Sequence, residues 1–249
     1  MSDTTGPIFF VIEAAADTKA IDGLTQFNDT LSRLHARRVP EIAVAGPLLK
    51  SKLAWKLATF QQAVLYRVVM LASGCALNWN AGNVLCSYLA ARALIETAVI
   101  FLTIEPELEL YIQKEDLGAI DSILMNRIFS TRNEQLIQDY PASKAVNILT
   151  LIDKLDQHGF HGLRQHYDFL SEICHPNASG QSHFFGFRDP ETHVTHYSDA
   201  RNLSRHMDHI LGGAMLLPLI ERVMDHVDNL IVRLAELHHR IAPIGGVDG

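Results

Sequence analysis

Three polar side chains that could take part in chemistry stand close together in the chain: Ser171, Glu172 and His175. On a helix, Ser171 and His175 would share one face, and Glu172 would lie three residues before the imidazole. A serine beside a histidine is the pairing of nucleophilic hydrolases, but that chemistry also needs an oxyanion hole, which no motif here supplies. The alternative is structural, because a histidine suits the negative end of a helix dipole and Pro176 would end the helix.

A second candidate is the pair Arg92 and Glu96, which lies in the apolar stretch SYLAARALIETAVIFL. A spacing of four residues brings the two charges together on one helix face. Burying such a pair is costly unless it is well hydrogen-bonded. The pair is therefore either a surface ion pair or half of a functional polar site. In the second case Arg92 should lie within hydrogen-bonding reach of Glu96, Ser171 or His175.

The segments ARALIE, which contains Arg92, and YDFLSEICHPNASG, which starts at Tyr167, together resemble a group of uncharacterised bacterial α-helical proteins. The pattern of that group is Arg-x-x-x-Glu followed by Tyr-x-x-Leu-Ser-x-x-x-His-Pro, and the similarity covers about residues 80–185. Some members are distantly similar to HEPN domains. The resemblance implies an all-α bundle and no established activity. It also implies a polar centre built from Arg92, Glu96, Tyr167, Ser171 and His175.

HEPN ribonucleases carry an arginine, usually followed by a polar residue, and a histidine five to seven positions after the arginine. Arg201, which is followed by Asn202, and His206 fit that spacing. The resemblance implies that His206 would act as general acid and base on a 2′-hydroxyl while Arg201 holds phosphate. Arg233 and His238 fit the same spacing, and so short a pattern also arises by chance.

Histidines are concentrated in one fifth of the chain: His158, His161, His166, His175, His183, His193, His196, His206 and His209. The pairs at 193/196 and 206/209 have spacings that could ligate a metal. Glu172 and His175 have the ligand step of di-iron bundles, but a second Glu-x-x-His motif is missing. Scattered surface histidines are the alternative, so we assign no metal ligand and no cofactor. Gly-rich phosphate loops and dinucleotide fingerprints are also missing from the sequence.

Composition and charge narrow the class of protein. The 249 residues are 48% hydrophobic and 20% charged, as in globular proteins, and the net charge of −7 counts against non-specific nucleic-acid binding. Cys75, Cys86 and Cys174 lie in apolar contexts without the spacing of a disulfide framework or zinc site. The apolar windows Leu94–Ile104 and Ile210–Ile220 are shorter than a membrane span. With no positively charged leader at the N-terminus, we expect a cytoplasmic protein without a membrane segment.

Apolar residues recur at three- and four-residue steps over most of the chain, which predicts helices. One starts near Thr18 and ends at Pro40, and Asn78 or Asn80 caps another. Pro106 separates that helix from the next, and Gly212, Gly213 and Pro218 kink or split the last one. The expected helices cover about residues 18–39, 47–74, 78–104, 108–129, 143–159, 162–174 and 198–240. Residues 130–142 are expected to form a loop, and residues 176–199 a small β-hairpin or lid.

The sequence therefore predicts one all-α domain over residues 1–249, a bundle of six or seven helices with a small β-hairpin or long loop near 180–198. Residues 1–16 are expected to form a poorly ordered arm or a short strand. The leading functional hypothesis is a helical binding or regulatory protein whose polar centre is structural or holds a small polar ligand, with a homodimer formed through the last helix. The alternatives are a HEPN-like, metal-independent ribonuclease or RNA-binding protein in a stress or defence setting, and a metal-dependent enzyme that uses the histidines between 158 and 209. Whether the chain is an enzyme stays open at this point.

Overall fold

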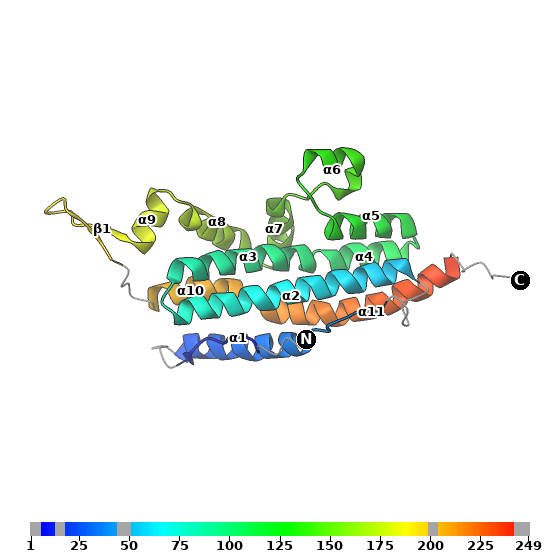
Figure 1. Cartoon of the computed structure of the whole chain (residues 1–249), viewed down its shortest axis with the longest axis horizontal. Coiled ribbons are helices and arrows are strands. Elements are labelled where there is room, and N and C mark those ends of the chain that lie inside the picture. Colours follow the sequence, from blue (N-terminus) through cyan, green and yellow to red (C-terminus); the bar gives the residue numbers. More distant parts are fainter. Residues whose placement is uncertain (1–5, 13–17, 44–50, 199–203, 242–249) are drawn as a thin grey trace, which may run out of the picture.

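The computed structural model describes residues 6–12, 18–43, 51–198 and 204–241. Two long apolar helices, α2 (Lys52–Asn80) and α3 (Val84–Leu102), lie side by side along the long axis of the molecule (Figure 1). The other elements are α1 (Thr18–Ala36), α4 (Ile104–Gln113), α5 (Leu117–Ile128), α6 (Glu134–Asp139), α7 (Ile148–Gln157), α8 (Leu163–Cys174), α9 (Ala178–Phe184), β1 (Gly186–Arg188), β2 (Thr195–Tyr197), α10 (Ser204–Ala214) and α11 (Leu217–Ile241). Because α3 is apolar on nearly every side, it is covered by α2, α7, α8, α10 and α11.

The predicted all-α class is confirmed, but the number of helices is larger than predicted. The described residues contain nine helices of ten or more residues and the two shorter helices α6 and α9. The strands β1 and β2 form an antiparallel hairpin in which Phe187 pairs with His196, and this hairpin stands away from the helices (Figure 1). The hairpin was predicted near residues 180–198, whereas α9 before it was not predicted.

One predicted helix, over residues 108–129, is in fact two. Glu115 has a left-handed backbone with φ of 55°, and Asp116 then caps α5 by accepting the Ala119 N–H at 2.9 Å. Pro106 does not separate α3 from α4 as predicted. It lies in the first turn of α4, where a missing N–H breaks no helical hydrogen bond.

An asparagine caps the start of α3, but it is neither of the two asparagines that the sequence predicted. The cap of α3 is Asn83, whose side chain accepts the Cys86 N–H at 3.3 Å. Asn80 instead holds the N-terminal arm, since it accepts the Val11 N–H at 3.0 Å and donates to the Phe9 carbonyl at 2.8 Å. Residues 6–12 of that arm form no strand, and Phe10 is buried beside Phe27 and Trp79.

Several helix boundaries in the structure differ from the predicted ones. Helix α2 continues past Gly74 to Asn80, and its predicted start at Pro47 lies outside the described residues. The predicted loop 130–142 contains α6 and a 3-10 turn, and α7 starts at Ile148, where Asn147 is the cap. Asp199, one of the two predicted starts of the last helix, also lies outside the described residues.

The sequence left open whether the last helix is kinked or split, and the structure contains two helices, α10 and α11. Pro218 stands in the first turn of α11. The apolar stripe of α11 is buried inside the chain, from Leu217 to Leu237. This stripe was the reason for predicting a homodimer, so the dimer stays a prediction without support from α11.

Two helical stretches, Lys52–Asn80 and Val84–Gln113, are long and apolar enough to cross a membrane by length and composition. Half of the most apolar window of each is buried inside the protein, as expected for the central helices of a bundle. The second stretch is longer than the sequence predicted because α3 runs almost directly into α4. A cytoplasmic location without a membrane segment stays a prediction.

Candidate functional site

One face of α3 carries three side chains at steps of four residues: Tyr88, Arg92 and Glu96. At one end of this row, Arg92 and Glu96 meet Tyr167 of α8. At the other end, Tyr88 meets side chains from α9 and α10. This face of α3 therefore connects two groups of residues, a polar centre and a cluster of histidine and aromatic rings, which belonged to separate hypotheses from the sequence.

The first group is a polar centre made of Arg92, Glu96 and Tyr167. The Tyr167 hydroxyl donates to Glu96 Oε1 at 2.8 Å and accepts from an Arg92 terminal nitrogen at 3.5 Å. The Arg92 guanidinium also lies 5.6 Å from the centre of the Tyr167 ring. Arg92 Nε is 3.3 Å from Glu96 Oε1, an ion-pair distance, although this N–H is not directed well enough for a hydrogen bond.

The environment of the polar centre keeps Arg92 charged. Burial opposes the charge, but the hydrogen bond to Tyr167 and the carboxylate of Glu96 together raise the pKa of Arg92. The side chains of Arg92 and Glu96 keep 28% and 33% of their surface exposed, so the pair is only partly desolvated. The sequence left open whether this pair is a surface ion pair or half of a polar site, and solvent access at its edge lowers the cost of holding two charges there.

The remaining predicted binding residues lie apart from this centre or lack partners. Ser171 Oγ is buried and makes no hydrogen bond within the described part of the chain. His175 and Glu172 are exposed, and Glu172 accepts a 2.8 Å hydrogen bond from Asn177. His175 is the cap residue at the C-terminal end of α8, as the alternative of a structural role for this histidine predicted. The Ser–His pair of a hydrolase is not formed, because α8 ends before the imidazole can lie over Ser171.

The second group is a histidine–aromatic cluster of seven rings: Tyr88, Phe169, Phe184, His166, His183, His206 and His209. Ring centres in contact are 4.2 to 6.5 Å apart. The shortest separation joins Phe169 and His209, whose rings stack. Helices α3, α8, α9 and α10 all contribute, so the cluster fixes where α9 and its hairpin leave the bundle.

His206 is the predicted catalytic residue that the structure describes, and it is buried at the edge of this cluster. The Tyr88 hydroxyl lies 3.1 Å from its Nδ1, and the ring stacks beside Phe184. Arg201, the predicted phosphate-binding partner, lies outside the described residues, as does Asn202.

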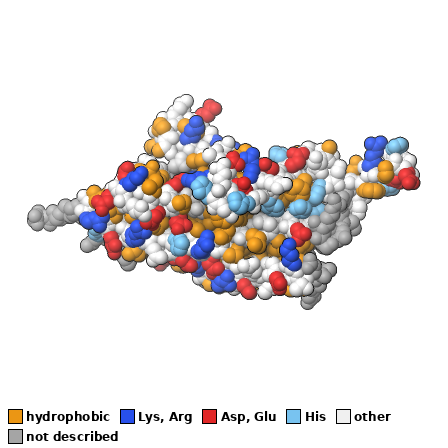
Figure 2. All heavy atoms as spheres, turned by 180° about the vertical axis from the view of Figure 1, so that it is seen from behind, with side chains coloured by type: hydrophobic (Ala, Val, Ile, Leu, Met, Phe, Trp, Pro, Cys, Tyr) orange, Lys and Arg blue, Asp and Glu red, His pale blue; other side chains and the backbone are white. Residues whose placement is uncertain are grey.

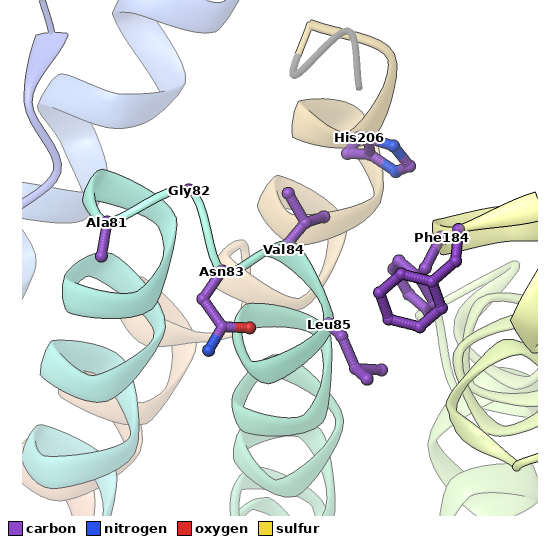
Figure 3. A pocket seen from close by; sticks show the side chains of 8 residues that line it. Ala81, Gly82, Asn83, Val84, Leu85, Phe184 and His206 are labelled. Atoms are coloured by element: carbon purple, nitrogen blue, oxygen red, sulfur yellow. The ribbon is translucent and has the colours of Figure 1, made fainter. Parts of the chain in front are cut away.

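A pocket of about 280 Å³ opens beside His206, at the end of the bundle where α2 turns into α3. Figure 3 shows the turn residues, the first residues of α3, His206 of α10 and Phe184 around this opening. Apolar walls come from Val84, Leu85, Phe184 and Phe185. We call this opening the turn pocket.

The histidines do not form a metal site in the described part of the chain. No group of three His, Cys, Asp or Glu side chains there is arranged to hold a metal ion. His193 and His196 stand on the projecting hairpin, while His206 and His209 face the aromatic cluster. The spacing was that of metal ligands, but the rings of His206 and His209 pack against other rings.

Sequence reasoning missed Tyr88, Phe169 and Phe184, which hold the histidines in place. Tyr88 had one available signal, because it precedes Arg92 by four residues on an otherwise apolar helix. No sequence pattern indicated Phe184, because it lies at the end of α9, in a stretch that was predicted as a strand.

Comparison of the sequence with protein-family models yields no match, and neither the curated proteins nor the solved structures contain a match.

Proposed function

We propose that this protein is a helical binding protein that takes a small ligand in the turn pocket, with the Arg92–Glu96–Tyr167 centre positioning α8, which contributes to the histidine–aromatic cluster beside the pocket. The observation that carries the proposal is His206. A buried imidazole that is oriented by a tyrosine hydroxyl and still lines an open pocket is a polar group set in an apolar site. Ligand pockets combine these two features.

The size and lining of the pocket indicate the kind of ligand. A volume of about 280 Å³ suits a molecule of one or two rings. Phe184, Phe185 and Leu85 offer apolar surface for such rings, and His206 offers a hydrogen-bonding edge. We propose a small planar molecule with at least one polar edge atom.

The polar centre supports this function by positioning α8. Its contacts tie Tyr167 to α3, and α8 also supplies Phe169 to the cluster around His183 and His209. The cluster in turn holds Phe184 and His206 at the pocket. In this proposal Arg92, Glu96 and Tyr167 are positioning residues, and Ser171, Glu172 and His175 do not contact the ligand.

The proposal is tested by titrating methyl-labelled protein with purine, indole and nicotinamide while recording methyl NMR spectra. We expect saturable shifts of the Val84 and Leu85 methyls with at least one of these probes. Val99, which is fully buried on the same helix, is the internal control and should not move. If every probe leaves the methyls of Val84 and Leu85 unmoved at millimolar concentration, the turn pocket is not a site for this ligand class.

A second candidate, metal-independent RNA cleavage, is favoured by the same residue. His206 is held by Tyr88 beside an open pocket, a position from which an imidazole could exchange a proton with a bound hydroxyl. Total RNA is incubated with the protein in excess EDTA, and the wild type is compared with His206→Asn and His175→Ala. Cleavage that is lost in His206→Asn and kept in His175→Ala would favour this candidate, whereas intact RNA would remove it.

A further inference from the structure

A second cavity, of about 510 Å³, lies where α1, the turn before α8 and the junction of α10 and α11 meet. Phe160, Leu163, Leu216 and Leu219 contribute apolar surface to its walls. Met215 lies at its edge with 61% of its surface exposed. We call this cavity the junction pocket.

The polar side chains around the junction pocket are one amide and two imidazoles. Gln26 and His161 are exposed at its rim, and neither lysine, arginine, aspartate nor glutamate is among its described lining residues. His166 forms part of the wall. Burial, and then the proximity of His209, lowers the pKa of His166, which favours a neutral ring at neutral pH.

The shape of the pocket depends on Gly212, which allows α10 to approach His166. A Cβ atom at position 212 would lie 2.7 Å from Cε1 and 2.8 Å from Nε2 of the imidazole. Any other residue would push the ring or the helix aside. The wall that His166 forms is therefore built by a close backbone approach that glycine permits.

We propose that the junction pocket is a second binding site, for a small neutral molecule with an apolar body and one hydroxyl or amide group. The apolar walls favour burial of a hydrocarbon or aromatic body. The amide of Gln26 and the imidazole of His161 can hydrogen-bond a polar end at the rim. A charged end would lose hydration without gaining an ion-pair partner among the lining residues. The volume lies within the range of pockets that hold such molecules.

The test uses three probes with one body and different ends: 4-ethylphenol, 4-ethylbenzoate and 4-ethylbenzylammonium. The Met215 methyl signal is followed in protein labelled at its methionine methyls, and Met70, on the exposed face of α2, is the reference signal. We expect 4-ethylphenol to shift Met215 saturably and to bind at least about tenfold more tightly than either charged probe, which corresponds to about 1.4 kcal/mol. Equal or tighter binding of a charged probe would overturn the proposed ligand class.

Two variants locate the bound probe. Leu219→Trp fills the pocket from its wall and should abolish the Met215 shift. Met215→Trp enlarges an exposed residue and should weaken binding read at the Leu219 methyls, even if the first variant folds poorly. Unchanged affinity in Met215→Trp, or no saturable shift in the wild type, would overturn the site. The probes and the methyl signals differ from those used for the turn pocket. The two proposed sites can therefore be refuted independently of each other.

Discussion

Tyr167 is the residue through which the polar centre holds α8 to α3. Its hydroxyl is the donor to Glu96 and the acceptor for Arg92, so a single oxygen links both members of the ion pair to a second helix. The four-residue spacing predicted that Arg92 and Glu96 share a face, whereas the place of Tyr167 beside them was implied by the resemblance of the two motifs to the uncharacterised family. Among the described residues, no hydrogen bond joins His175 to these three, because His175 lies exposed at the C-terminal end of α8, directly before Pro176.

Removing that oxygen has a predictable cost. We expect Tyr167→Phe to lower the free energy of unfolding by about 1–3 kcal/mol, because it removes a hydrogen bond to a charged, half-buried carboxylate. Urea unfolding measures the change. Tyr140→Phe is the matched control, because Tyr140 is 64% exposed and should change stability by less than about 0.5 kcal/mol. Equal effects of the two variants would show that the hydroxyl of Tyr167 contributes nothing.

Cys75 makes stability depend on pH in the alkaline range. Burial raises the pKa of its thiol from the ordinary 9.0 to about 12, while the neighbouring Ser87 hydroxyl opposes this shift. In the unfolded chain the thiol loses its proton near pH 9, whereas in the folded chain it keeps the proton until near pH 12. The contribution of the neutral thiol is therefore fully present below pH 9 and is lost as pH rises toward 12.

The matched variant is Cys75→Val, which removes the titrating group from the same site. We expect the free energy of unfolding of the wild type to fall more steeply than that of the variant between pH 9 and 11, by up to about 1.4 kcal/mol per pH unit. Parallel curves for the two proteins would contradict a raised pKa for Cys75. Chemical denaturation at a series of pH values supplies the curves.

At the scale of elements, the start of α3 determines where Val84, Leu85 and Tyr88 stand relative to the turn pocket. Asn83 caps this start, and Gly82 precedes it with φ of 75°. The sequence suggested an asparagine cap but favoured Asn78 or Asn80, because three asparagines within six residues offer equal local signals. The choice is made by tertiary contacts, since Asn80 is used to hold the N-terminal arm.

Loss of the Asn83 cap should loosen the first turn of α3, which lines the turn pocket. We expect Asn83→Ala to cost about 1 kcal/mol of stability and to speed hydrogen exchange in the first turn of α3. Asn229→Ala removes an exposed asparagine from the middle of α11 and is the control. Hydrogen exchange followed by mass spectrometry reports both. Unchanged protection of residues 84–87 in Asn83→Ala would mean that another group caps the helix.

At the scale of the whole molecule, charged side chains join helices that are distant in sequence. Arg37, which directly follows α1, contacts Asp225 and Asp228 of α11, each at 2.7 Å, and Gln61 of α2 donates to Asp228 at 2.8 Å. Charged and histidine side chains are spread over the surface shown in Figure 2, without one dominant basic patch. These contacts could not be predicted, because the partners are between 167 and 191 residues apart and periodicity gives no information on pairing.

The ion pairs of Arg37 with Asp225 and Asp228 should make a small, salt-dependent contribution to the free energy of unfolding. We expect Arg37→Gln to lower the free energy of unfolding by about 0.5–1 kcal/mol at low salt and by less at 1 M NaCl. Arg222→Gln is the control, because Arg222 is exposed on α11 and forms no ion pair with the described residues. A loss that is the same at both salt concentrations would indicate that packing, not charge, explains the effect.

The central claim is that the turn pocket beside His206 binds a ligand. Its most direct test is the affinity of two matched variants for the tightest planar probe found by methyl NMR. Leu85→Trp fills the pocket, whereas Leu89→Trp places the same side chain one turn further along α3, at a position that is 44% exposed and does not line the pocket. The claim predicts that Leu85→Trp loses binding by at least about tenfold while Leu89→Trp binds like the wild type. Equal affinity of the two variants would contradict it.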